Sequence, residues 1–223
     1  MLVFELINKD LKPLGRDESA GRAVSVMRDQ SVSYYPVIDE STGQLLGEAS
    51  LEELQDRAID RSQGLIDTSM PPGLFLREFD HILDASRTML IHNRTFLPVV
   101  DRTGNFMGTV SKAILMDSVI RLLNLRDSGT VIMVEMEPRD YMLSDVIRII
   151  EAEGARILSI TIQAPDAILE RFRVSVKLNL DDLARVGSAL RRYGYLITAE
   201  SYSEESDHEL SQKAEEFFRY LDI

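Results

Sequence analysis

An internal repeat constrains the fold of this chain more than any other feature of its sequence. Residues 34–39 (Tyr-Tyr-Pro-Val-Ile-Asp) correspond position by position to residues 96–101 (Phe-Leu-Pro-Val-Val-Asp). The offset of about 62 residues is the spacing that tandem domains give. A chain of 223 residues is therefore predicted to contain several small units rather than one large domain.

The similarity extends on both sides of these segments. Before each of them, apolar and small residues at i, i+3, i+4 and i+7 predict an amphipathic helix: Ala20, Ala23, Val24 and Met27, then Ile82, Ala85, Ser86 and Met89. After each of them, a polar turn with glycine joins two apolar runs, as in a β-hairpin. Ser50 and Ser111 then precede a second helical pattern and are placed to cap it. Residues 1–65 and 66–125 are each predicted to form helix, strand, strand, helix.

A different pattern follows a short polar linker at residues 124–129. An apolar strand at 131–136 precedes a helix that Gly154 ends. Two strands come next, and in the second of them, residues 171–178, apolar and polar side chains alternate. A further helix and strand complete a ferredoxin-like βαββαβ order over residues 129–202. The fold class is therefore mixed α/β (α+β).

The last segment, residues 203–223, is acidic and amphipathic. From Glu200 onward the chain has eight carboxylates and two basic side chains. Ser206 and Glu209 form a capping-box signature, and an apolar stripe follows it at Leu210, Ala214, Phe217 and Leu221. We expect a helix that packs against the sheet or a neighbouring subunit, and the alternative is a frayed acidic tail that confers solubility.

Composition excludes several functions. The chain has no cysteine, which excludes disulfides, thiol nucleophiles and thiolate zinc sites. Its net charge of -12 has the wrong sign for binding nucleic acid or an anionic membrane. No apolar run approaches the roughly 20 residues that span a bilayer, and the first eleven residues do not resemble a signal peptide. We expect a cytoplasmic protein.

The repeated units PVID…TGQLLGEAS and PVVD…TGNFMGTVS resemble a tandem pair of cystathionine-β-synthase (CBS) domains, the Bateman module. The second half, with the segment EAEGARILSI joining a helix to a strand, resembles an ACT domain. A CBS pair followed by an ACT domain is similar to the acetoin-utilisation AcuB family. This resemblance implies a non-catalytic, ligand-sensing regulatory protein. It also implies a homodimer or a larger homo-oligomer.

CBS pairs hold adenine nucleotides with a Ser or Thr, and an Asp three positions later, at the start of the last helix. Carried over by this resemblance, Ser50 and Glu53 form the first nucleotide-binding site, with Glu53 one methylene longer than the family's residue. Ser111 and Lys112 form a second phosphate contact, which has Ile114 at the acidic position. Physically, a helix N-terminus attracts phosphate. The competing interpretation is that Ser50 and Ser111 only cap their helices and that Glu53 is a solvated acid.

The ligand is expected to be AMP, ADP, ATP or S-adenosylmethionine, and no further cofactor or metal is expected. Glu53 predicts that the Ser50 site binds nucleotide more tightly than the Ser111 site. In the ACT-like half, Arg139 and Asp140 align with the family's effector turn, although the glycine of that turn is missing. These two residues could pair with an amino acid, and the alternative is that this half serves only assembly.

An enzyme is not expected. His81 and His92 lie about 16 Å apart on one predicted helix, which is too far for one metal ion. Asp80 and Asp84 lie near His81, as acid-base chemistry would require. Carboxylates at the start of a helix are equally expected, because the helix dipole favours them there. The chain has no phosphate-binding or hydrolase motif. The alternative to a nucleotide sensor is an interaction scaffold with degenerate sites.

Overall fold

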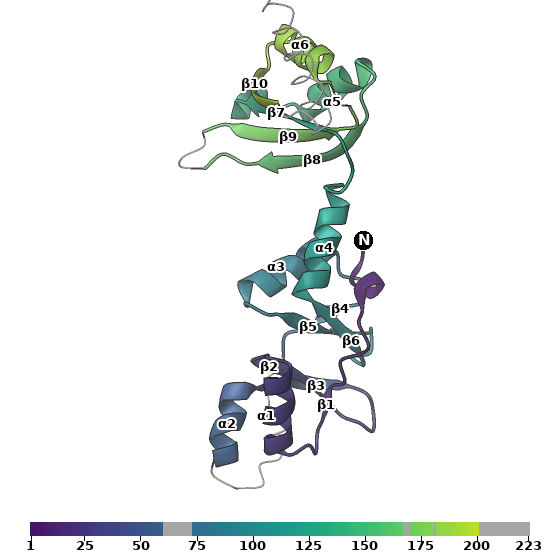
Figure 1. The fold of residues 1–223 in the computed structure, drawn as a ribbon, viewed down its shortest axis with the longest axis vertical. Helices are drawn as coiled ribbons and strands as arrows, with labels where there is room; N and C mark the ends of the chain where they lie inside the picture. The colour runs from purple at the N-terminus through teal and green to yellow at the C-terminus, as the bar shows by residue number, and fades with distance from the viewer. Residues whose placement is uncertain (60–72, 167–169, 181, 201–223) are drawn as a thin grey trace, which may run out of the picture. The chain divides into compact units, whose positions relative to one another are not determined.

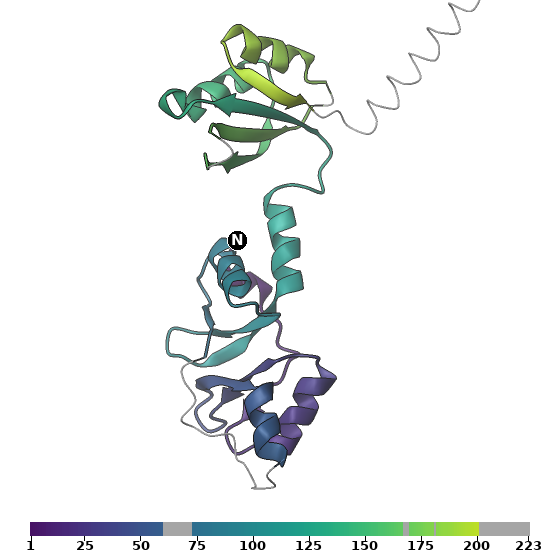
Figure 2. The ribbon, with the colours of Figure 1, turned by 90° about the vertical axis from the view of Figure 1, so that its left-hand side faces the viewer.

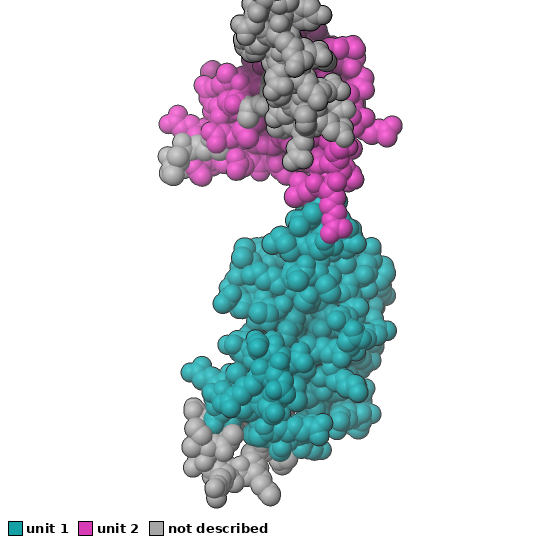
Figure 3. Space-filling model, in the orientation of Figure 1, with its two compact units in different colours: residues 1–122 teal, residues 123–223 magenta. Residues whose placement is uncertain are grey.

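The computed structural model describes residues 1–59, 73–166, 170–180 and 182–200. The chain divides into two compact units, residues 1–122 and 123–223, which Figure 3 colours separately. The helix that the sequence predicts at residues 203–223 lies outside the described residues. Among the described residues, no helix is both long enough and apolar enough to cross a membrane.

The first unit contains the same arrangement twice, as the repeat predicts (Figure 1). The first copy consists of β1 (Leu14–Gly15), α1 (Ala20–Asp29), β2 (Tyr34–Ile38), β3 (Leu45–Ser50) and α2 (Leu51–Ile59). The second consists of β4 (Leu76–Arg77), α3 (Ile82–Ile91), β5 (Phe96–Val100), β6 (Phe106–Ser111) and α4 (Lys112–Leu122). In each copy a short parallel strand precedes an antiparallel pair. The two parallel strands, β1 and β4, were not predicted, because two residues show no periodicity.

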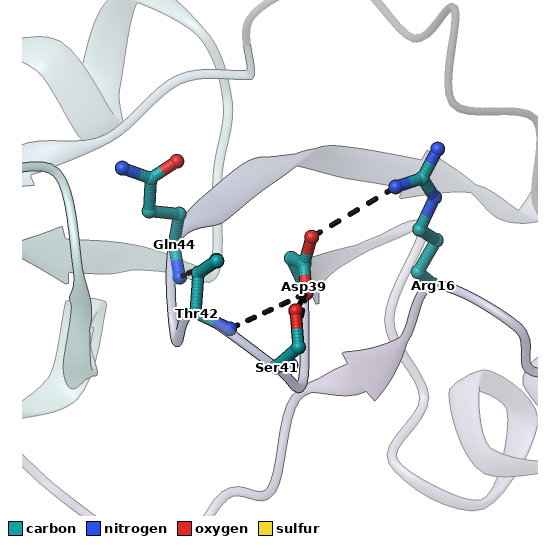
Figure 4. A network of polar contacts seen from close by, with 5 residues as sticks. All are labelled: Arg16, Asp39, Ser41, Thr42 and Gln44. Carbon is teal, nitrogen blue, oxygen red and sulfur yellow. Dashed lines mark hydrogen bonds and ion pairs between the residues drawn. The ribbon is translucent and has the colours of Figure 1, made fainter.

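Each antiparallel pair turns at an aspartate. The backbone N–H of Ser41 donates to Asp39 Oδ1 at 2.8 Å, its hydroxyl donates to the same oxygen at 2.6 Å, and Arg16 lies 3.8 Å from Asp39 Oδ2 (Figure 4). Asp101 accepts the equivalent pair of hydrogen bonds from Thr103 at 2.8 and 2.7 Å. These side-chain bonds stabilise each turn in addition to the backbone hydrogen bonds that close it.

The tips of the two hairpins bind to each other. The backbone N–H of Leu45 donates to the carbonyl oxygen of Gly104 at 3.0 Å, and that of Phe106 donates to Gly43 at 2.9 Å. Gly43 and Gly104 both have positive φ values, 76° and 89°, which glycine adopts without steric cost. The two repeats are therefore joined by matching hydrogen bonds.

The N-terminal segment packs on the second repeat. A 3-10 helix, η1 (Val3–Leu6), places Val3 and Leu6 in the core of that repeat. Asn8 then pairs with Thr109, donating to its carbonyl at 2.8 Å and accepting from its N–H at 2.9 Å. Gly108 makes this approach possible, since a Cβ there would lie 2.6 Å from the Asn8 carbonyl oxygen. The chain therefore crosses from the second repeat to the first between Asn8 and β1.

The second unit is a four-stranded antiparallel sheet with two helices (Figures 1 and 2). Its elements are β7 (Thr130–Met136), η2 (Pro138–Asp140), α5 (Leu143–Ala152), β8 (Ile157–Gln163), β9 (Phe172–Leu178), α6 (Ala184–Arg192) and β10 (Leu196–Glu200). The strand order β10-β7-β9-β8 is that of a ferredoxin-like fold. The core lies between the helices and the sheet, and includes Ile132, Val146, Ile150, Val176 and Leu190. The predicted mixed α/β fold is confirmed.

The linker before β7 is fastened to the sheet of this unit. Lys177 is buried, with 8% of its surface exposed, and its ammonium donates to the carbonyl oxygens of Asn124 and Asp127, both at 2.6 Å. The Asn124 side chain donates to the Leu158 carbonyl at 2.6 Å. The sequence identified residues 124–129 only as a polar linker, whereas the lysine fixes its backbone.

Candidate functional site

A cavity of about 560 Å³ lies between the two repeats of the first unit. The second repeat contributes Phe96, Thr109 and Ser111, and the first repeat contributes α1 and β2. The crossing segment from Asn8 to Leu14 forms a further wall. We call this space, defined by Ser111, Thr109 and Phe96, the Ser111 cleft.

Ser111 is both a helix cap and a cleft residue. It ends β6, and its hydroxyl oxygen accepts a hydrogen bond from the backbone N–H of Ile114 at 3.3 Å. This bond confirms the predicted capping role. The hydroxyl proton can still donate to a bound group because the cap uses only the oxygen as acceptor. Lys112, the first residue of α4, is exposed, and no hydrogen bond joins it to Ser111.

One wall of the Ser111 cleft is aromatic and apolar. Tyr35 and Phe96 are 3% and 8% exposed, and their ring centroids lie 5.9 Å apart at an angle of 83°. The Tyr35 hydroxyl, whose ordinary pKa is 10.0, is protonated at neutral pH and can donate a hydrogen bond, and burial raises its pKa further. Leu11, Leu14 and Val26 complete this wall. A flat ring could be buried here between apolar surfaces.

Charged side chains surround the rest of the Ser111 cleft. Lys12 and Arg22 bring positive charge to it, and Asp10 and Glu18 bring carboxylates. Arg22 Nε on α1 lies 3.3 Å from Oε1 of Glu18, which precedes that helix, and the arginine side chain is 72% exposed. Such an exposed pair adds little stability and can rearrange around a charged ligand. The cleft can therefore match both an anionic group and hydroxyl donors.

The Ser50 side of the pair is different. Ser50 ends β3 and Glu53 is exposed in the first turn of α2, and neither lines the Ser111 cleft. Tyr34 lies opposite Ser50 on β2. Glu48 precedes Ser50 by two residues and so faces the same side of β3. By the register of the two hairpins, Ser50, Glu48 and Tyr34 correspond to Ser111, Thr109 and Phe96, and we call this equivalent position the Ser50 cleft.

An arginine contacts two of these three residues, Tyr34 and Glu48, although Tyr34 remains 41% exposed. The guanidinium carbon of Arg94 lies 3.2 Å from the centre of the Tyr34 ring, and its Nη2 lies 3.0 Å from Glu48 Oε2. The side chains of Arg94 and Glu48 are 12% and 4% exposed. Burial raises the pKa of Glu48, and the charge of Arg94 partly opposes this effect. Sequence reasoning missed this pair, whose members are separated by more than 40 residues.

Arg139 and Asp140 form a local pair in the second unit. Both belong to η2, where Arg139 Nε lies 3.5 Å from Asp140 Oδ2, and their side chains are 84% and 68% exposed. Tyr141 follows them and packs on Phe172 with ring centroids 4.2 Å apart. The two predicted effector residues are therefore adjacent, and they satisfy each other on the surface of this unit.

His81 and His92 lie at the two ends of α3. His81 precedes α3, and its Nδ1 accepts the backbone N–H of Leu83 at 3.3 Å, while His92 follows the helix end. In the part of the chain that the structure describes, no cluster of three or more His, Cys, Asp or Glu side chains could hold a metal ion.

Comparison with known proteins finds similarity over about half of this chain. A CBS domain-containing protein of Dictyostelium discoideum is 25% identical over 137 residues, which cover 55% of this chain and 94% of that protein. A crystal structure of a CBS domain pair/ACT domain protein from Thermotoga maritima is similar with a TM-score of 0.48 and 24% identity, over 55% of this chain and 99% of that one. CBSX2, crystallised in complex with AMP, gives a TM-score of 0.43 and 23% identity, over 54% and 96% of the two chains.

The CBS domain family matches this chain twice, at residues 3–59 and 69–121. Both matches fall in the first unit and coincide with its two structural repeats. The second match also begins near the strand that opens the second copy, β4. Residues 3–121 are therefore a tandem pair of CBS domains.

Proposed function

We propose that this chain is a regulatory protein that binds an adenine-containing ligand in the Ser111 cleft. The observation that carries the proposal is the cavity of about 560 Å³ with a helix-capping serine in its wall. Small-molecule sites are typically clefts of about 300 to 1,000 Å³ with an apolar lining and a few polar groups. The Ser111 cleft fits this description in size and in chemistry.

Each part of such a ligand has a suitable wall. The ring would lie against Tyr35 and Phe96, which are aromatic and buried. The phosphate would lie near Ser111, where the N-terminus of α4 adds a positive dipole and Lys112 adds a charge. The ribose hydroxyls would donate to a carboxylate such as Asp10 or Glu18.

This proposal differs from the sequence-based expectation on one point. The sequence favours the Ser50 site because of Glu53, whereas the proposal assigns the ligand to the Ser111 cleft. The reason is that Arg94 contacts both Tyr34 and Glu48 beside Ser50. That expectation stays a prediction, and titration of variants in each cleft decides between the two sites.

The second unit is proposed to be an ACT domain, which extends the resemblance to the AcuB family. Its strand order supports the ferredoxin-like part of this assignment. A homodimer or larger homo-oligomer is proposed as the working form in the cytoplasm. Exposed apolar side chains on α3, namely Leu83, Leu90 and Ile91 at 51%, 72% and 62% exposure, support assembly through the first unit. Light scattering that gives a monomer at micromolar concentrations would contradict assembly.

Calorimetric titration of the full chain with AMP, ADP, ATP and S-adenosylmethionine tests the proposal. We expect saturable binding of at least one of the four, with competition among those that bind. Inorganic phosphate and adenine serve as controls for the two ends of the ligand, and each should bind more weakly than the whole molecule. If none of the four binds at millimolar concentration, the interaction scaffold becomes the better description of the CBS pair.

A further inference from the structure

The two repeats of the CBS pair can be matched residue by residue from their hydrogen bonds. Tyr34 pairs with Ser50 across the first hairpin, and Phe96 pairs with Ser111 across the second. The backbone N–H of Val32 donates to Met27 at 3.0 Å, and that of Arg94 donates to Met89 at the same distance. Arg94 is therefore the counterpart of Val32.

Three counterpart positions decide how the two clefts differ. The Ser111 cleft has Phe96 and Thr109, and Val32 packs in the same core cluster as Phe96. At the same three positions the Ser50 cleft has Tyr34, Glu48 and Arg94. The neutral side chains of Thr109 and Val32 leave a cavity at the Ser111 cleft. In the Ser50 cleft, Arg94 and Glu48 form an ion pair at the equivalent positions.

We propose that Arg94 is a resident plug of the Ser50 cleft and that the CBS pair therefore binds one ligand per chain rather than two. A guanidinium is flat and cationic, and it stacks on an aromatic ring as a planar base would. Arg94 lies on Tyr34 in this way, at 3.2 Å from the ring centre. The counterpart ring, Phe96, lines the Ser111 cleft.

The carboxylate that holds the plug is fixed by the chain that enters the second repeat. The backbone N–H of Leu74 donates to Glu48 Oε2 at 3.3 Å, the same oxygen that pairs with Arg94. Gly73 packs so closely that a Cβ there would lie 2.7 Å from Glu48 Cγ. Glu48 therefore has little freedom to release the guanidinium and turn toward a ligand.

We expect that neutral side chains can replace Arg94 and Glu48 together. Among the described residues, Glu48 Oε1 and Arg94 Nε have no hydrogen-bond partner although both atoms are buried. A buried ion pair with incomplete hydrogen bonding is poor evidence for stability, and neutral replacements of both partners are often tolerated. Replacing both residues by their counterparts should therefore open the Ser50 cleft without unfolding the repeat.

Calorimetric titration with AMP tests this proposal by measuring the number of binding sites per chain. The proposal rests on the proposed function only through the choice of AMP as the probe. The opened variant is R94V/E48T, which gives the Ser50 cleft the residues of the Ser111 cleft at these two positions. The matched closed variant is V32R/T109E, which gives the Ser111 cleft the arginine and the carboxylate of the Ser50 cleft. We expect one site in the unmodified chain, two in the opened variant and none in the closed variant.

The outcomes separate this proposal from the proposed function. One site in both the unmodified chain and the opened variant overturns the plug and leaves the Ser111 cleft as the ligand site. No site in the unmodified chain and one in the opened variant supports the plug and contradicts binding in the Ser111 cleft. No site in either protein, or two sites in the unmodified chain, overturns the plug. If R94V/E48T does not fold by circular dichroism, R94A/E48Q replaces it in the same titration.

Discussion

Ser111 in the second repeat and Ser50 in the first end their strands at the same register. Ser111 lies beside Thr109 and lines a cavity, whereas Ser50 lies near Glu48, which pairs with Arg94. The strands, the hairpin turns and the capping position are common to both. The difference lies in a few side chains that face the space between the repeats. The backbone of this fold therefore provides two equivalent positions, and the side chains decide which of them can receive a ligand.

The largest expected effect comes from removing one partner of the buried pair. Arg94→Met leaves Glu48, whose side chain is 4% exposed, without a counter-charge. We expect a loss of about 3–5 kcal/mol in the free energy of unfolding at pH 7, as is usual for breaking a buried ion pair. Urea denaturation measures the loss, and R94V/E48T is the matched control because it removes both charges.

The loss in Arg94→Met should also depend on pH. Burial already raises the pKa of Glu48, and removing the arginine raises it further. A carboxyl with a raised pKa in the folded state destabilises the protein as pH rises above its ordinary value, because the charged form is disfavoured by folding. The destabilisation should be smaller at pH 5 than at pH 7. A loss below about 1 kcal/mol at both pH values would mean that the pair is not buried in solution.

The two hairpins offer a second comparison, through their glycines. Gly108 has φ of 143°, and a Cβ there would lie 2.5 Å from an Ile7 methyl group and 2.6 Å from the Asn8 carbonyl oxygen. Gly108→Ala should cost about 2–4 kcal/mol, because the N-terminal segment must move off the second repeat. Gly43 also has positive φ but has no atom near its Cβ position. Gly43→Ala should therefore cost only about 1 kcal/mol.

Thermal or urea unfolding of the two glycine variants distinguishes backbone strain at the substituted position from displacement of the N-terminal segment. Equal losses would indicate that only backbone strain matters and that the N-terminal segment contributes little to the second repeat. A further check is the rate of amide hydrogen exchange at Asn8 and Thr109, which should rise in Gly108→Ala and not in Gly43→Ala.

Much of the fold could be predicted because its signals are local. Helix faces such as Ala20, Ala23, Val24 and Met27 are buried as their spacing indicates. The alternation in β9 likewise places Val174 and Val176 in the core. The parallel strands β1 and β4 and the helix η1 were not predicted, because segments of two to four residues are too short for a periodic signal.

The candidate site was less predictable because its walls come from distant segments. The sequence identified Ser50 and Ser111 by their positions before helices, and it could not show that the crossing segment from Asn8 to Leu14 lines one cleft. The Arg94–Glu48 pair could have been identified from the repeat in the sequence. Aligning the repeats sets Arg94 against Val32 and Glu48 against Thr109, so that two opposite charges, one in each repeat, stand where the other repeat has a neutral residue.

Alanine substitutions of Ser111 and of Ser50 test which of the two clefts binds the ligand. Ser111→Ala should weaken AMP binding about tenfold, or about 1.4 kcal/mol, since it removes a hydrogen bond to a charged group. Ser50→Ala should leave the affinity within about twofold, and it is a suitable control because both serines precede a helix and should lose similar capping energy. A tenfold loss in Ser50→Ala instead would restore the sequence-based preference for the first site.

The smallest expected effect concerns Asp101, in the part of the two repeats that is most alike. Hydrogen bonds from the Thr103 hydroxyl and the Asn105 backbone N–H lower the pKa of Asp101 to about 2, and bonds from Ser41 lower the pKa of its counterpart Asp39. A carboxylate with a lowered pKa in the folded state adds stability above its ordinary pKa of 3.8, and that contribution is lost as pH falls toward about 2. Asp101→Asn should therefore lower the urea midpoint at pH 6, and its difference from the unmodified chain should shrink as pH falls from 4 to 2. Asp39→Asn should change with pH in the same direction, because Ser41 donates to Asp39 the same pair of bonds that Thr103 donates to Asp101. A difference that does not change with pH would show that the amide loses the geometry of the turn rather than the charge.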